Sequence, residues 1–71
     1  MSADEKLAQY MKLDRQQLLE IAFAHPTFGE WFRAEQHHLV FQELIARLID
    51  GEFGRGEGYN AIQRYFRTKG I

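Results

Sequence analysis

Apolar and polar residues recur with a helical period along most of the chain, starting at its first residues. Ser2 and Glu5 have the spacing of a capping box, in which the hydroxyl and the carboxylate each bond a free backbone N–H at a helix start. Leu7, Tyr10 and Met11 then follow at helical spacing. The pattern predicts a short first helix.

A second helix is predicted immediately afterwards. Asp14 and Gln17 repeat the capping spacing, and an apolar band follows them. Proline disfavours α geometry in the residue before it, so we expect this helix to end near His25, which precedes Pro26.

The third predicted helix is the longest and covers residues 28 to 50. Thr27 and Glu30 form another capping pair at its start, and Gly51 can adopt the left-handed conformation that closes a helix. Its apolar residues do not form one straight stripe, because they shift around the helix between its two ends.

The second half of this helix carries more apolar surface than a short chain is expected to cover. We therefore predict self-association as a homodimer, because a partner subunit would bury the remaining surface. The predicted dimer interface consists of Val40, Phe41, Leu44, Ile45 and Leu48.

A fourth helix is predicted from residue 58 to about residue 68. Tyr59, Ile62 and Phe66 share one side and are expected to face inward, while a polar and basic face lies opposite. The fold class is therefore all-α, with residues 1–71 forming one small four-helix domain: a short first helix, a long central helix and an amphipathic last helix after a glycine-rich loop.

Composition narrows the functional classes without selecting one. The chain has 71 residues, no cysteine and a net charge of −1, so neither disulfides nor a strong overall field contributes. No apolar run approaches the 18 residues that suggest a membrane span, and no secretory signal pattern is present. We expect a cytoplasmic protein without a membrane partner.

Four glycines lie close together between the third and fourth predicted helices. A glycine-rich turn before a helix can hold an anion, which makes Arg55, Gly56 and Gly58 candidate anion-binding residues. The phosphate-loop and dinucleotide-binding patterns are both absent, however. We therefore interpret the segment chiefly as a hinge between two helices.

The sequence contains few residues in the arrangements typical of catalytic or metal-binding sites. Glu35 and His38 have the spacing used in helical carboxylate metal sites, but one such pair is common by chance. His25 and His37 complete the histidines, and no nucleophile stands in a recognisable relation to them. We predict no metal site, no cofactor and no enzymatic activity.

The last predicted helix and the aromatic residues favour a binding function. We predict a non-enzymatic interaction protein, a regulator or inhibitor that binds a larger protein through an aromatic and arginine-bearing surface. The alternative is a DNA-binding regulator that uses residues 58–69 as a recognition helix, because Asn, Gln and Arg contact base edges. The candidate partner-binding residues are Trp31, Tyr59, Asn60, Gln63, Arg64, Tyr65 and Arg67.

Overall fold

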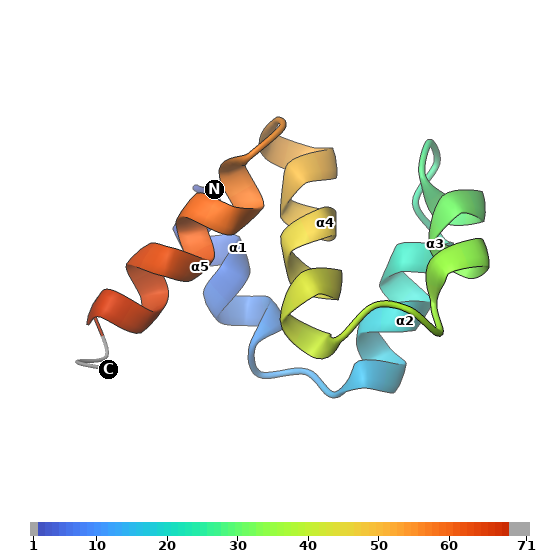
Figure 1. Cartoon of the computed structure of the whole chain (residues 1–71), viewed down its shortest axis with the longest axis horizontal. Coiled ribbons are helices and arrows are strands. Elements are labelled where there is room, and N and C mark those ends of the chain that lie inside the picture. Colours follow the sequence, from blue (N-terminus) through green and yellow to red (C-terminus); the bar gives the residue numbers. More distant parts are fainter. Residues whose placement is uncertain (1, 69–71) are drawn as a thin grey trace.

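A computed structural model describes residues 2–68, and all of the regular secondary structure in this range is helical. α4 lies in the middle of the molecule, with α1 and α5 on one side of it and α2 and α3 on the other (Figure 1). The described helices are α1 (Ala3–Tyr10), α2 (Arg15–Phe23), α3 (Gly29–Glu35), α4 (Phe41–Phe53) and α5 (Glu57–Thr68).

The first two helices start where the capping patterns predicted. The Glu5 N–H donates to Ser2 Oγ at 3.2 Å, and the Ser2 hydroxyl in turn donates to the Glu5 carboxylate at 3.3 Å. Asp14 and Gln17 form a complete capping box, with the Gln17 N–H on Asp14 Oδ1 and the Asp14 N–H on Gln17 Oε1. These contacts span three residues, so the local sequence is sufficient to specify them.

The prediction of one long helix over residues 28 to 50 is wrong, and the chain forms five helices between residues 2 and 68 instead of four. The helix is interrupted at residues 36–40, where the backbone turns before α4 begins. α4 also continues through Gly51, which was expected to end it. The residue that follows α4 is Gly54, whose φ of 122° lies in the region that favours glycine.

A side chain from another helix holds this interruption in place. The Arg15 guanidinium donates to the carbonyl oxygen of Leu39 at 2.6 Å and also to that of Gln36. These bonds satisfy carbonyl groups that would otherwise be left without partners between α3 and α4. The interruption lets Leu39 enter the core, where it is 6% exposed, and lets α3 fold back against α2.

The predicted cap at Thr27 is also wrong. The residue before α3 is Phe28, which makes no capping hydrogen bond with its side chain. The ring of His25 instead stabilises the turn that precedes α3, because its Nδ1 accepts from the N–H groups of Thr27 at 3.1 Å and Phe28 at 3.0 Å. No side chain caps α3 itself.

The core forms around α4 and is covered by the chain itself. Leu44, Ile45, Leu48 and Ile49 are all completely buried, so the premise that this chain cannot cover them is wrong. The remaining buried apolar residues are Leu7, Tyr10, Leu18, Ala22, Phe32, Leu39 and Ala61.

The buried residues of α4 bear directly on the predicted dimer interface. Leu44, Ile45 and Leu48 offer no surface to a second copy, because each is 0% exposed within one chain. Of the five predicted interface residues, Val40 is exposed and Phe41 is half-buried. The buried face of α4 therefore has no apolar surface left for a dimer interface. Self-association through a different part of the molecule stays a prediction.

α5 packs against α4 through its smallest residues. A Cβ at Gly58 would lie 2.0 Å from the carbonyl oxygen of Ala46, so only glycine fits at this crossing. Ala61 is fully buried one turn later, and Ile62 is half-buried. The prediction that Tyr59 faces inward is wrong, since this residue is 63% exposed.

A tyrosine joins the first helix to the end of α4. The Tyr10 hydroxyl donates to the Glu52 carboxylate at 2.7 Å, and the residue is 3% exposed. Burial, the hydrogen bond to Glu52 and the charge of that carboxylate together raise the pKa of Tyr10 above its ordinary value of 10.

None of the helices between residues 2 and 68 combines the length and apolar character that a membrane crossing requires.

Candidate partner-binding surface

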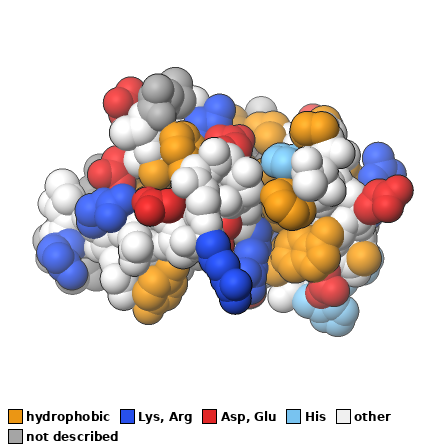
Figure 2. Space-filling view, turned by 90° about the horizontal axis from the view of Figure 1, so that it is seen from above, with side chains coloured by type: hydrophobic (Ala, Val, Ile, Leu, Met, Phe, Trp, Pro, Cys, Tyr) orange, Lys and Arg blue, Asp and Glu red, His pale blue; other side chains and the backbone are white. Residues whose placement is uncertain are grey.

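A shallow hollow of about 230 Å³ lies between α3 and α4. Phe28 and Trp31 form one wall and are each 42% exposed, while Phe32 contributes to the floor and is 1% exposed. We call this feature the α3–α4 hollow; it is lined by Phe28, Trp31, Phe32, Arg47, Asp50 and Gly51. Figure 2 shows apolar side chains at the surface on the side of the molecule that holds α3, next to Lys and Arg side chains near its middle.

Gly51 shapes the wall of this hollow. A Cβ at this position would lie 3.1 Å from Cδ2 of Phe28 and 3.4 Å from Nε2 of His25. The rings of His25 and Phe28 also contact each other, with centroids 5.0 Å apart. Glycine inside α4 therefore allows the two rings to approach the helix closely.

Arg47 borders the hollow opposite the tryptophan. Its Cζ lies 5.8 Å from the centroid of the Trp31 ring, a cation–π arrangement that contributes about 0.5–1 kcal/mol at an exposed site. Its Nη2 is 3.6 Å from Glu43 Oε1, and both of these side chains are about half exposed. Such an exposed ion pair is weak, so Arg47 remains available to an incoming carboxylate.

A second hollow, of about 410 Å³, adjoins the first on the other side of Arg47. We call it the α4–α5 hollow. Arg47 and Asp50 line both hollows, so the two features are neighbours along α4. The second hollow is lined by Val40, Gln42, Glu43, Ala46, Arg47, Asp50, Tyr59 and Ile62.

The exposed large apolar side chains concentrate in these two hollows. Val40 is 65% exposed and Tyr59 is 63% exposed in the second hollow, and Phe28 and Trp31 line the first. Four of the six exposed large apolar side chains among the described residues therefore line two neighbouring hollows that share Arg47 and Asp50. We define the Trp31 surface as Phe28, Trp31, Val40, Arg47 and Tyr59.

The predicted partner-binding residues do not form a single site. α4 lies between Trp31 on α3 and the candidate residues on α5 (Figure 1). Tyr59 alone among the α5 candidates joins the Trp31 surface, through the α4–α5 hollow. Asn60, Gln63 and Arg67 are exposed on α5 and line neither hollow.

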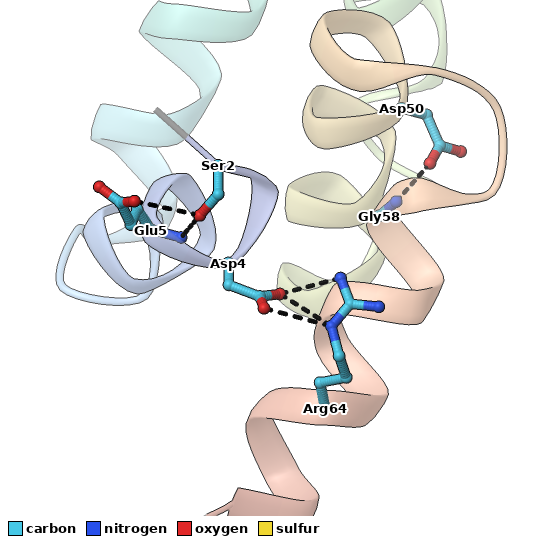
Figure 3. Close-up of polar contacts among 6 residues, drawn as sticks. All are labelled: Ser2, Asp4, Glu5, Asp50, Gly58 and Arg64. Carbon is cyan, nitrogen blue, oxygen red and sulfur yellow. Dashed lines mark hydrogen bonds and ion pairs between the residues drawn. The ribbon is translucent and has the colours of Figure 1, made fainter.

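Arg64 and Tyr65 face the other neighbour of α5. Arg64 forms a two-pronged contact with Asp4 of α1, with Nη2 at 2.9 Å and Nε at 3.0 Å from Oδ1 (Figure 3). This hydrogen bond raises the pKa of Arg64 above its ordinary value. Tyr65 is half-buried against the core and meets Phe66 edge to face at 5.5 Å.

The glycine-rich turn contains an internal carboxylate where an anion was predicted. The Gly58 N–H donates to Asp50 Oδ1 at 2.7 Å, and Figure 3 shows this carboxylate directed at the turn that opens α5. The Glu57 N–H is bonded to the carbonyl of Gly54 at 3.2 Å. Asp50 therefore supplies the negative charge that the start of α5 favours, while Arg55 lies exposed nearby.

The described residues contain no group of three or more His, Cys, Asp or Glu side chains placed to hold a metal ion. His37 and His38 are both exposed in the turn before α4, and His25 Nδ1 accepts two backbone N–H groups in the turn before α3. All fully buried side chains between residues 2 and 68 are apolar apart from the tyrosine hydroxyl already described.

Sequence reasoning missed Phe28 and Arg47 as parts of the surface. On the predicted third helix Phe28 shares one side with Phe32 and Leu39, and it was not named as a binding candidate. Arg47 was placed on the polar strip of a continuous helix, where it could not meet Trp31.

Searches of protein-family models, curated proteins and solved structures find no match to this chain.

Proposed function

We propose that this chain is a non-enzymatic interaction protein, a regulator or inhibitor that binds a larger protein through the Trp31 surface. The observation that carries the proposal is the joining of four exposed large apolar side chains around Arg47. Tryptophan, tyrosine and arginine are the residues that dominate binding energy at protein interfaces.

The size of the α3–α4 hollow supports a protein partner over a small substrate, whereas the α4–α5 hollow, at about 410 Å³, falls within the range of ligand pockets and does not bear on this choice. The α3–α4 hollow, at about 230 Å³, is smaller than the 300–1,000 Å³ typical of ligand pockets, and it is open to solvent. It has room for one or two side chains of a partner. A hydrophobic side chain beside Trp31 and a carboxylate beside Arg47 would match its chemistry.

The proposal is tested by affinity capture from lysate of the source cells, comparing the wild-type chain with Trp31→Ala and Arg47→Ala. Phe53→Ala is the matched control, because Phe53 is 36% exposed but lines neither hollow. We expect a specific captured protein to be reduced at least about tenfold by the first two variants and to be retained by the control. Equal capture by all four chains would overturn the proposal, provided that circular dichroism shows all of them folded.

A second candidate function is DNA binding through α5, and one observation favours it. Asn60, Gln63 and Arg67 are exposed together on this helix. Arg64 is already bound to Asp4, and the Asp50 carboxylate occupies the helix start at which a phosphate would bind. These two contacts make DNA binding the weaker candidate.

Salt dependence separates the two candidates. Binding to duplex DNA would weaken steeply as salt concentration rises, and Arg67→Ala would reduce the slope of that dependence by about one. An interface anchored by aromatic residues would respond much less to salt.

A further inference from the structure

The interruption between α3 and α4 is not encoded by the residues that form it. No glycine or proline occurs from residue 30 to residue 50, so the local sequence permits a continuous helix. Gln36, at the end of α3, keeps helical angles of −54° and −33°. Val40, before α4, makes no capping hydrogen bond with its side chain.

Arg15 and a continuous helix compete for the same two backbone acceptors. In a continuous helix the carbonyl of Gln36 would accept from the N–H of residue 40, and that of Leu39 from the N–H of residue 43. In the structure both carbonyls accept from the Arg15 guanidinium. Loss of Arg15 therefore removes two contacts that favour the interrupted form, while the burial of Leu39 remains.

The interruption divides the chain into two parts that pack against each other. We call residues 2–35 the arm, which contains α1, α2 and α3, and residues 41–68 the body, which contains α4 and α5. α3 packs chiefly on α2, inside the arm, while α1 packs on both helices of the body (Figure 1). The arm contributes Leu7, Tyr10, Leu18 and Phe32 to the shared core, and it cannot leave the body without exposing them.

We propose that residues 36–40 are the hinge of a domain-swapped dimer. In this dimer residues 29–53 form one continuous helix of about 37 Å, and the arm of each copy packs on the body of the other. The partner is a second copy of this chain. Arg15 keeps the monomer closed by holding the hinge in its turned form.

The exchange keeps the arm–body contacts and changes the hinge, including Leu39, which is buried in the closed form. The Asp4–Arg64 ion pair and the Tyr10–Glu52 hydrogen bond both join arm to body, so in the dimer each would join two chains. Each core of the dimer is formed by the arm of one copy and the body of the other, through the same arm–body interface as in the monomer. This inference rests on the hinge and not on the function proposed for the Trp31 surface, although Val40 belongs to both.

The first test compares oligomeric states by light scattering after refolding at about 1 mM and at about 10 µM chain. Arg15→Gln is expected to increase the dimer fraction relative to monomer by about tenfold or more, because each bond from a charged donor is worth at least about that factor. Lys12→Gln is the charge-matched control, since this exposed residue precedes α2 and is expected to leave the monomer unchanged.

Proline at the hinge provides a variant with the opposite expected effect to Arg15→Gln, since it should favour the monomer. Val40 has φ of −76°, which proline accepts, and its side chain is 65% exposed. Val40→Pro is compatible with the interrupted form but removes the N–H that a continuous helix requires. We expect it to abolish dimers both alone and combined with Arg15→Gln. If Arg15→Gln does not fold, the comparison of wild type with Val40→Pro after refolding at high concentration decides the question.

Cross-linking distinguishes arm exchange from association of intact monomers. The chain contains no cysteine, so Asp4→Cys in one chain and Arg64→Cys in another provide unique sites. Both chains carry Arg15→Gln, are refolded together and are treated with a short bismaleimide. We expect a covalent product of twice the chain mass, which is absent when Val40→Pro is also present.

Two results would overturn the proposal. One is a folded Arg15→Gln chain that stays monomeric at the higher concentration. The other is a dimer that forms without the cross-link between positions 4 and 64, or that persists with proline at position 40.

Discussion

The backbone N–H of Gly58 donates to the carboxylate of Asp50 at 2.7 Å, which joins the start of α5 to the last turns of α4. The same glycine lies directly against the backbone of Ala46, where a Cβ would be 2.0 Å from the carbonyl oxygen. Gly58 is thus both hydrogen-bonded to a side chain of α4 and packed against the backbone of α4. The glycine-rich segment is therefore a tightly specified helix junction.

Replacing the capping carboxylate should weaken this junction. We expect Asp50→Ala to lower the free energy of unfolding by about 1–2 kcal/mol, because the N–H of Gly58 and the positive end of the helix dipole lose their partner. Asp50→Asn retains an acceptor oxygen and should cost clearly less. Urea denaturation followed by circular dichroism measures both, and equal losses for the two variants would contradict a capping role.

Adding a single methyl group at the helix crossing should be more damaging. Gly58→Ala is expected to destabilise the fold by about 1–3 kcal/mol or more, because the new Cβ meets backbone that cannot move aside. Gly51→Ala is the control, since its Cβ would meet only the side chains of Phe28 and His25. Thermal unfolding of the two variants should show the larger loss at position 58, and the reverse order would contradict the packing described.

The raised pKa of Tyr10 predicts a loss of stability in alkaline solution. The buried phenol stays protonated in the folded chain at pH values where it ionises in the unfolded chain, so its contribution is complete below about pH 10 and declines as pH rises further. Urea titrations from pH 8 to pH 11 should show a decline that is smaller in Tyr10→Phe. Identical pH dependence in the two chains would show that Tyr10 ionises normally.

The turn before α3 should depend on an imidazole acceptor. His25→Ala removes the Nδ1 atom that accepts from Thr27 and Phe28, and we expect a loss of about 1 kcal/mol in the free energy of unfolding. Because Phe28 contacts the same ring, the Trp31 surface should also change, which tryptophan fluorescence reports. His37→Ala, at an exposed position in the turn, is the control and should leave both signals unaltered.

Local signals accounted for much of the secondary structure. The capping patterns at Ser2 and Asp14 correctly located the first two helices, and the start of the last helix was predicted within one residue. The shifting apolar arc across residues 28 to 50 was interpreted as a change of neighbours along one helix, and it did not reveal the interruption at residues 36–40. A contact between residues 15 and 39 lies beyond the reach of any local pattern.

The candidate surface was predicted only in part. Trp31 and Tyr59 were named from their residue types, and both line the hollows that meet at Arg47. Arg64 was assigned to the same surface because its position on the helix wheel is polar, yet it faces Asp4 on the other side of α5. The orientation of a helix about its axis depends on which neighbours it packs against, and one sequence does not contain that information directly.

The sequence alone determined that the chain is helical, where most helices start, and which side chains are apolar enough to be buried. These properties depend on backbone propensities and on contacts within one or two turns. The tertiary structure decided where the central helix is interrupted, that α4 is buried by its own chain, and that Trp31, Arg47 and Tyr59 share a surface. Each of these depends on groups that are distant in the sequence, such as the Arg15 guanidinium on the carbonyls of residues 36 and 39, and only the folded chain brings them together.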